Sequence, residues 1–218
     1  GVEFLYDTKV TGINRSPSNV MSIDTSQGII KGDVVVNAAG AWAAEIARFA
    51  GESIPVKALK RQVCSIKEKN TLPENTPMTI WVDTAFHFRM RNEYLILLLP
   101  DEPENNNDLN IESAWLEKVF TVSKEKIPAL KSCSIDKTGS WAGYYEVSPD
   151  EHLILGKAEN LNNLYYANGS SGHGVMHSPA IGELLANIIC GKQNEIDTDI
   201  LSPNRFSAGK LIEQIPFF

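Results

Sequence analysis

The sequence lacks the features that mark several large classes of protein. Its three cysteines, Cys64, Cys133 and Cys190, are far apart and form no CxxC pair, so neither a zinc site nor a disulfide framework is expected. The longest apolar run, residues 95–99, is too short to cross a bilayer, and no charged and then apolar leader opens the chain. These absences predict a cytoplasmic protein with free thiols, no membrane span and no metal site.

Basic clusters are also missing. The 218 residues carry a net charge of −7, and no run of lysine and arginine is interleaved with aromatic side chains. Because nucleic-acid surfaces are basic, no nucleic-acid partner is expected. The remaining composition, 43% hydrophobic and 22% charged, is enough for a sizeable core in one or two domains.

The most informative segment is a glycine-rich turn at residues 169–174. A short apolar strand at Leu164–Ala167 precedes it, and Ala180–Ile189 has the apolar spacing of a packed helix. The glycines allow positive φ and close approach of a ligand, and the unpaired N–H groups of a helix start favour an anionic or carbonyl-rich group. His173, flanked by two glycines, is suited to hydrogen bonding rather than to core packing.

Two further motifs accompany this turn. An apolar strand at Val34–Asn37 leads through Ala38-Ala39-Gly40 into a helix predicted over Ala41–Ala50. The third motif, Gly-Tyr-Tyr-Glu-Val-Ser-Pro-Asp, occupies residues 143–150.

Together the three motifs resemble the D-amino-acid oxidase superfamily of FAD-dependent amine oxidoreductases. The resemblance is greatest to the branch of sarcosine oxidase, dimethylglycine dehydrogenase and the proline dehydrogenase β-subunit. It implies FAD as cofactor and a small secondary or tertiary amino acid as substrate, oxidised at its C–N bond by hydride transfer to the flavin. No lysine lies in residues 92–98, where sarcosine oxidases carry one that promotes reaction with oxygen, and this favours a dehydrogenase over an oxidase.

The resemblance also implies a fold that is α/β plus α+β. Residues 1–53 and 139–218 are expected to form a partial FAD-binding domain of the two-dinucleotide-binding type, and residues 54–138 an inserted, mostly antiparallel substrate-binding sheet. The GxGxxG turn that receives the pyrophosphate in such domains is absent, so the chain is interpreted as the C-terminal portion of a longer protein.

Two consequences follow for cofactor and partners. FAD is expected in the intact protein but absent or weakly bound in this chain alone. A homo-oligomer, a missing N-terminal segment or a partner subunit is expected to cover the exposed sheet edge. The competing interpretation is a non-catalytic, truncated or subunit-like module that binds no flavin by itself.

The resemblance assigns roles to individual residues, each with an alternative. Val10 would meet the adenine edge through its backbone or be an ordinary strand valine, and Trp42 would cover the flavin or, as the residue type favours, fill the core. The small residues after the second strand would admit a dinucleotide or serve close helix–strand packing. The cofactor-binding set is Val10, Ala38, Ala39, Gly40, Trp42, Gly172, His173, Gly174, Val175 and Met176.

The catalytic set is His173, Arg89 and Tyr145. In sarcosine oxidases a lysine three places after the histidine binds the substrate carboxylate, and Met176 stands there in this sequence. Arg89, in a strand that alternates with apolar residues, would replace it as a two-pronged carboxylate ligand, unless it is a solvent-facing arginine. Either Tyr144 or Tyr145 should face the site, because neighbouring strand residues point to opposite faces.

Hydrophobic patterning predicts the remaining elements. The polar segment Asp101–Asp108 is expected to be a solvated loop, and Ile111–Val122 a helix. The further strands are expected at Val2–Leu5, Lys9–Ile13, Val20–Thr25, Gly28–Lys31, Gln62–Ile66, Thr79–Val82, Phe86–Met90, Tyr94–Leu99, Lys137–Tyr145 and Leu153–Leu155.

Overall fold

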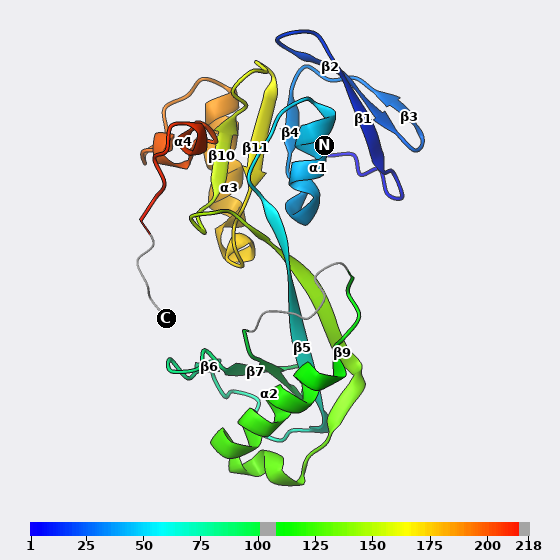
Figure 1. Cartoon of the computed structure of the whole chain (residues 1–218), viewed down its shortest axis with the longest axis vertical. Helices are drawn as coiled ribbons and strands as arrows, with labels where there is room; N and C mark the ends of the chain where they lie inside the picture. Colours follow the sequence, from blue (N-terminus) through cyan, green and yellow to red (C-terminus); the bar gives the residue numbers. More distant parts are fainter. Residues whose placement is uncertain (101–107, 214–218) are drawn as a thin grey trace. The chain divides into compact units, whose positions relative to one another are not determined.

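The computed structural model of the chain describes residues 1–100 and 108–213 (Figure 1). The described residues form two compact units: one of Gly1–Ala58 and the segment from Tyr145 onward, the other of Leu59–Tyr144. The expected loop at Asp101–Asp108 lies outside the described residues except for Asp108 itself. The fold is mixed α/β with antiparallel sheets, as the sequence predicts.

The first unit opens with an antiparallel meander. Strands β1 (Val10–Arg15), β2 (Val20–Thr25) and β3 (Gly28–Ile30) pair in that order. The predicted strand at Val2–Leu5 is wrong, because that segment has no regular structure and is exposed. Asp7 has a φ of 53° in the turn before β1, so the chain before it does not continue the direction of β1. Apolar side chains alone do not make a β-strand unless a neighbouring strand accepts and donates its backbone hydrogen bonds.

A second sheet of the first unit carries the strand order β10-β11-β4. Strands β10 (Ile154–Lys157) and β11 (Leu164–Asn168) are antiparallel, whereas β11 and β4 (Val35–Asn37) are parallel. The segments that follow β4 and β11 therefore leave from the same edge of the sheet, which is where open α/β sheets bind ligands.

Two helices follow these two strands, and Figure 1 shows them beside the sheet. After β4 come a short 3-10 helix, η1 (Gly40–Trp42), and helix α1 (Ala43–Phe49), which buries Ala43 and Ala47. The core of the unit joins α1 to β2, β4, β10 and β11; its members are Val20, Val35, Ala43, Ala47, Ala50, Ile54, Val56, Ile154, Ala158, Leu161, Leu164 and Tyr166.

Helix α3 (Gly174–Ile189) follows β11 and begins six residues earlier than predicted, with Pro179 inside it. Proline normally weakens a helix because it lacks the N–H that would bond the carbonyl four residues back. Here the hydroxyl of Ser178 donates to the Val175 carbonyl at 3.1 Å, so that carbonyl has a partner. Only Leu185 of α3 is buried, so the packed helix predicted here is mostly uncovered among the described residues. The chain then continues through η3 (Asp199–Leu201) and α4 (Asn204–Ser207).

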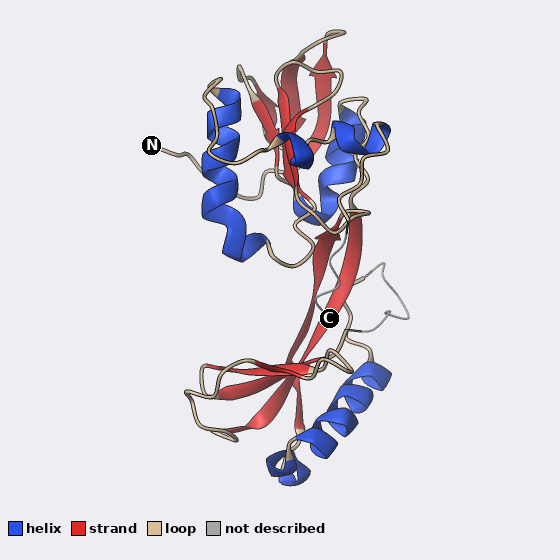
Figure 2. Cartoon of the chain, turned by 90° about the vertical axis from the view of Figure 1, so that its left-hand side faces the viewer, coloured by secondary structure: helices blue, strands red, loops and turns tan. Residues whose placement is uncertain are grey.

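The second unit is a five-stranded sheet covered on one face by a helix (Figure 2). The strand order is β6 (Thr79–Ile80), β7 (His87–Arg91), β8 (Tyr94–Leu98), β5 (Lys57–Lys69) and β9 (Ile135–Val147). Helix α2 (Ser113–Lys126), followed by η2 (Pro128–Ser132), packs Trp115, Leu116, Val119 and Phe120 onto the sheet, which confirms the apolar face read from the sequence. Burial in this core raises the pKa of the Cys64 thiol to about 12, so this thiol is protonated and inert at neutral pH.

Among residues 1–100 and 108–213, no helix combines the length and the apolar character needed to cross a membrane. The three cysteines all lie in this part of the chain, and each is a free thiol.

Candidate cofactor site

A cavity lies at the carboxyl end of β4 in the first unit. Its volume is about 310 Å³, and it is lined by Val10, Ile13, Ile23, Val35, Val36, Asn37, Ala38, Ala39 and Ile46. Three residues of the predicted cofactor-binding set, Val10, Ala38 and Ala39, therefore line one cavity although they come from two elements. The wall is mainly apolar with a few backbone groups, which suits a flat heteroaromatic ring.

The turn beside this cavity is held by Asn37. Its Oδ1 accepts a hydrogen bond from the Ala39 backbone N–H at 3.1 Å, and its Nδ2 donates to the Ala43 carbonyl at 2.9 Å. Gly40 then has a φ of 56°, which a residue with a Cβ adopts with difficulty, and η1 begins there. Small residues and one asparagine thus bend the chain from strand to helix.

The glycine-rich turn after β11 is also tightly specified. Gly169, Ser171 and Gly172 have φ values of 75°, 49° and 96°. The backbone of Glu146 in β9 accepts from the Ser171 N–H at 3.0 Å, and its side chain accepts from the Ser170 N–H at 3.3 Å. The backbone N–H groups of Ser170 and Ser171 therefore fasten the turn to the end of β9, which belongs to the first unit.

The start of α3 leaves hydrogen-bond donors without acceptors. The His173 N–H bonds the Ser170 carbonyl at 2.9 Å, but within the described residues the backbone N–H groups of Gly172, Gly174 and Val175 make no hydrogen bond. Unbonded N–H groups at the first turn of a helix carry partial positive charge. This end of α3 can therefore bind an anionic or carbonyl-rich group.

Tyr145 lies against the glycine turn. A Cβ built on Gly172 would lie 2.7 Å from Cε2 of Tyr145, and the three atoms nearest to that position all belong to this tyrosine. Of the two tyrosines left open by the sequence, it is thus Tyr145 that meets the turn, and its side chain is partly exposed. Gly172 is required both by its positive φ and by the space that the ring takes.

His173, Val175 and Met176 are exposed at the start of α3. The His173 ring stacks on the ring of His177, with centroids 6.0 Å apart, a pairing that the four-residue spacing could have indicated. Val175 is 91% exposed and Met176 is 69% exposed. Trp42 is 59% exposed, so it does not fill the core of this unit, which takes the alanines of α1; its place beside the flavin stays a prediction.

Arg89 belongs to the second unit. Phe88 and Met90 of β7 contact the core under α2, so Arg89 projects from the opposite face of the sheet, where it is exposed. Within the described part of the chain it makes no ion pair. A guanidinium with free donors on an open sheet face can bind a carboxylate with two parallel hydrogen bonds.

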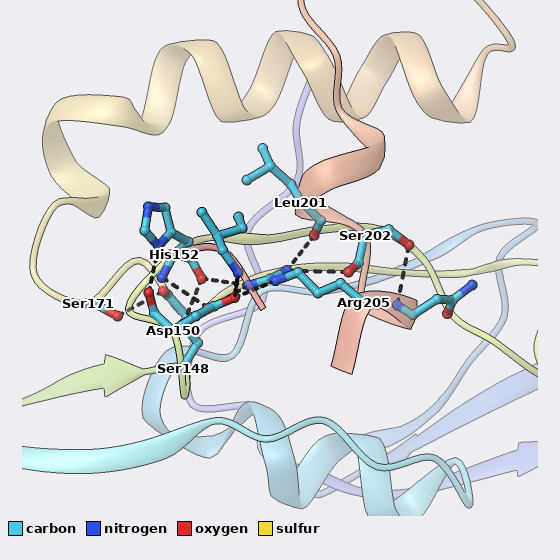
Figure 3. Close-up of polar contacts among 10 residues, drawn as sticks. Ser148, Asp150, His152, Ser171, Leu201, Ser202 and Arg205 are labelled. Carbon is cyan, nitrogen blue, oxygen red and sulfur yellow. Dashed lines mark hydrogen bonds and ion pairs between the residues drawn. The ribbon is translucent and has the colours of Figure 1, made fainter. Parts of the chain in front are cut away.

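A buried ion pair that sequence reasoning missed lies in the first unit (Figure 3). Arg205 of α4 contacts Asp150 through Nε at 2.8 Å and through Nη2 at 2.9 Å. Arg205 also donates to the Leu201, Ser202 and His152 carbonyls. Asp150 ends the motif at 143–150, but its partner Arg205 lies 55 residues later, and no local pattern indicates it.

The Asp150 carboxylate is fully hydrogen bonded. It accepts from the Ser148 hydroxyl at 3.1 Å and from the Ile212 backbone N–H at 3.3 Å. Burial alone would raise the pKa of Asp150, but the Arg205 guanidinium and the backbone donors outweigh it and hold that pKa well below its usual range. The pair fastens the segment from Asp199 to Ile212 to the turn before β10.

Three buried polar atoms have no partner in the described structure: Oε2 of Glu146, the hydroxyl of Tyr166 and Oδ1 of Asn168. Burial raises the pKa of Tyr166, which keeps its hydroxyl neutral. Glu146 and Asn168 both adjoin the glycine turn.

Comparison with known proteins places this geometry in a family. Residues 1–188 match the model of the DAO family, described as FAD dependent oxidoreductase. The FAD-dependent oxidoreductase domain-containing protein 1 of Xenopus laevis is 34% identical over 173 residues, which are 72% of this chain and 34% of that protein. Mitochondrial dimethylglycine dehydrogenase of Mus musculus is 23% identical, over 94% of this chain and 26% of its own length.

Solved structures have the same fold. L-proline dehydrogenase from P. horikoshii superposes with a TM-score of 0.84 at 32% identity, over 94% of this chain and 55% of that one. Glycine oxidase from Geobacillus kaustophilus superposes with a TM-score of 0.80 at 22% identity, over 91% of this chain and 52% of that one. The chain thus spans about a third of the length of the first curated relative and about half of these solved chains.

Proposed function

Because the chain belongs to the DAO family of FAD-dependent oxidoreductases, we propose that it is the part of an amino-acid oxidoreductase that holds one side of FAD. The intact protein would oxidise the C–N bond of a small secondary or tertiary amino acid. FAD supplies the acceptor for the hydride that leaves the substrate's α-carbon. The observation that carries the proposal is the convergence of Val10, Ala38 and Ala39 on one cavity at the carboxyl edge of the parallel strands.

The residues present fit the cofactor. The cavity is large enough for an adenine ring, and its alanines leave room that larger side chains would fill. The unbonded N–H groups of Gly172, Gly174 and Val175 suit the carbonyl-rich pyrimidine end of a flavin. The exposed side chains of Trp42 and Met176 would be covered by the cofactor or by further protein.

The chain's own residues then have distinct tasks. His173 would hydrogen-bond flavin or substrate beside the turn, and Tyr145 would line the cavity for the substrate. Arg89 would bind the substrate carboxylate, since Met176 cannot. The first unit, predicted as residues 1–53 and 139–218, would thus bind the cofactor, and the second, predicted as 54–138, the substrate. The lack of a lysine in residues 92–98 favours a dehydrogenase.

A flavin-binding experiment tests the proposal. Quenching of flavin fluorescence on titration with the purified chain reports FAD affinity. Replacing Ala39 by Leu fills the cavity and should weaken binding by about tenfold or more, corresponding to about 1.4 kcal/mol. Ala180→Leu, on the exposed side of α3, is the matched control and should leave the affinity unchanged.

The alternative is a module that binds no flavin alone, and the missing GxGxxG turn favours it. We expect the purified chain to be colourless or to carry FAD in less than stoichiometric amount. Stoichiometric, tightly held flavin in the absorption spectrum would contradict this expectation and imply that this chain supplies its own pyrophosphate site. Absence of any FAD binding at millimolar flavin would favour the alternative.

A further inference from the structure

Asn168 ends β11 at the edge of the sheet where β4 also ends. Its Nδ2 donates to the carbonyl of Asn37 at 2.7 Å, and the residue is 0% exposed. The direction of this amide is determined by its partner, because a carbonyl oxygen only accepts. The contact therefore joins the last residues of two parallel strands that are far apart in the sequence.

The oxygen of the Asn168 side-chain amide shows why the contact of its nitrogen with Asn37 matters. Oδ1 is buried and has no partner within the described residues, so its removal from water is not offset by a hydrogen bond. An apolar side chain of similar shape would avoid that cost. The Nδ2 donor must then stabilise something that an apolar residue would not.

The hydrogen bond to Asn37 continues into the next turn. Asn37 holds the Ala39 N–H and the Ala43 carbonyl with its side chain, so displacing its peptide moves the wall of the cavity. On the other side, Gly169 and the glycine turn follow Asn168 directly. Hydrogen bonds thus connect Asn168, which directly precedes the glycine turn, through Asn37 to the start of α1.

We propose that Asn168 is a positioning residue of the cofactor site, which holds the turn after β4 and the turn after β11 in one fixed arrangement through its bond to the Asn37 carbonyl. The identity of the ligand rests on the proposed function, but the coupling of the two turns does not. Asn168 acts through Asn37 and the backbone of Ala39 rather than by contact with a reacting atom.

The chain offers a matched control at the other end of the same strand. Asn163 directly precedes β11 and donates from its Nδ2 to the carbonyls of Val20 at 2.9 Å and Asp33 at 3.2 Å. Asn163→Asp and Asn168→Asp both replace a donor with an oxygen of the same size that faces a carbonyl. Both variants should lower the Tm by a few degrees, because each kcal/mol of lost folding stability lowers the Tm of a chain of this length by about 2–4 °C.

Hydrogen exchange of the full 218-residue chain, read by NMR, tests the coupling without any ligand. In Asn168→Asp the Ala39 amide should exchange about tenfold faster relative to the Tyr166 amide, whereas in Asn163→Asp this ratio should stay within about twofold. Acidification should partly restore protection in Asn168→Asp, because a protonated carboxyl again has a donor for the Asn37 carbonyl. If Asn168→Asp folds poorly, Asn168→Ala serves, with the same acceleration but no recovery on acidification.

FAD titration of the same variants tests the positioning role. Asn168→Asp should weaken FAD binding about tenfold more than Asn163→Asp does. Unchanged Ala39 exchange in Asn168→Asp overturns the proposal, and so does faster exchange with unaltered FAD affinity. If wild type and variants all fail to bind FAD, the proposed function fails for this chain, while the exchange ratio still decides whether Asn168 holds the turn.

Discussion

At the scale of single residues, the interactions that matter most in the first unit are between side chains far apart in the sequence. Asp150 and Arg205 are 3% and 4% exposed and meet with two parallel hydrogen bonds. Two buried charges of opposite sign in this geometry are strongly interdependent, because either one alone would stay buried without its counter-charge.

Asp150→Asn should therefore destabilise the first unit by about 3–5 kcal/mol, since Arg205 stays buried without its counter-charge. Urea unfolding at neutral pH measures this. The control is Glu93→Gln, which removes the exposed pair with Lys69 and should change stability little. A loss no larger in Asp150→Asn than in the control would show that the pair is not needed.

The depressed pKa of Asp150 also predicts a pH dependence. A carboxyl with a folded pKa below its unfolded value of about 3.9 contributes stability that is complete above that unfolded value and is lost as the pH falls through the folded one. Stability measured downward from pH 5 should thus fall more steeply in wild type than in Asp150→Asn. Parallel curves would contradict the assignment.

Arg89 is the exposed guanidinium expected to bind the substrate carboxylate in the intact enzyme. Arg89→Lys should raise KM strongly with a smaller change in kcat, because a point charge cannot reproduce two parallel hydrogen bonds. Steady-state kinetics of the complete protein measures this. Arg89→Ala with an unchanged KM would remove the carboxylate assignment, and Met176→Lys is not expected to rescue it, since the two residues lie on different elements.

His173 is expected to affect the flavin or the rate of the reaction rather than the affinity for substrate. His173→Asn keeps a polar side chain at the start of α3 and should chiefly lower kcat or shift the flavin absorption bands. The His177 ring stacks on that of His173, so His177→Asn tests this pairing and should change both properties less than His173→Asn does. An unaltered spectrum together with unaltered turnover in His173→Asn would contradict the role.

At the scale of elements, Gly172 and Gly182 should affect the stability of the fold in opposite directions. Gly172 has a φ of 96° and leaves no room for a Cβ beside Tyr145, whereas Gly182 lies inside α3 with nothing within 4 Å of an added Cβ. The first glycine is demanded by the turn, and the second only weakens the helix.

Gly172→Ala should cost about 2 kcal/mol or more and displace the turn, whereas Gly182→Ala should stabilise α3 by about 0.5–1 kcal/mol. Thermal unfolding of the two variants, compared with wild type, measures both effects. A Gly172→Ala protein as stable as wild type would mean that the turn and the Tyr145 ring shift easily.

At the scale of the whole chain, several large apolar side chains are exposed in the first unit. They include Val34, Val36, Trp42, Val175 and Met176, and β4 stands at the end of its strand order. An uncovered parallel strand next to exposed apolar side chains favours association.

We therefore predict that the chain self-associates or binds a partner chain. Sedimentation velocity at micromolar concentration should show species larger than 24.0 kDa. Val36→Lys, which places a charge on the exposed face of β4, should reduce the association, whereas Val82→Lys, at an exposed position of the second unit, should not. A wild-type monomer under these conditions would contradict the prediction.

The local elements and the family could be predicted from the sequence. Alternation and apolar spacing predict the meander, β4, β7, β8, β11 and the buried face of α2, because apolar residues recur there at the positions that face the core. Three motifs in order indicated the family, which the match over residues 1–188 shows. The predicted strand at Val2–Leu5 is wrong, since composition cannot tell whether a neighbour covers an apolar residue.

The contacts between residues far apart in the sequence could not be predicted and became visible only in the folded chain. The contacts of Asp150 with Arg205, of Asn168 with Asn37 and of Tyr145 with Gly172 join segments separated along the chain. Hydrogen bonds and steric contacts act over a few ångströms in space, whereas periodicity records only neighbours in sequence. The residues that shape the cofactor site were therefore visible individually in the sequence, but the network that holds them in place required the fold.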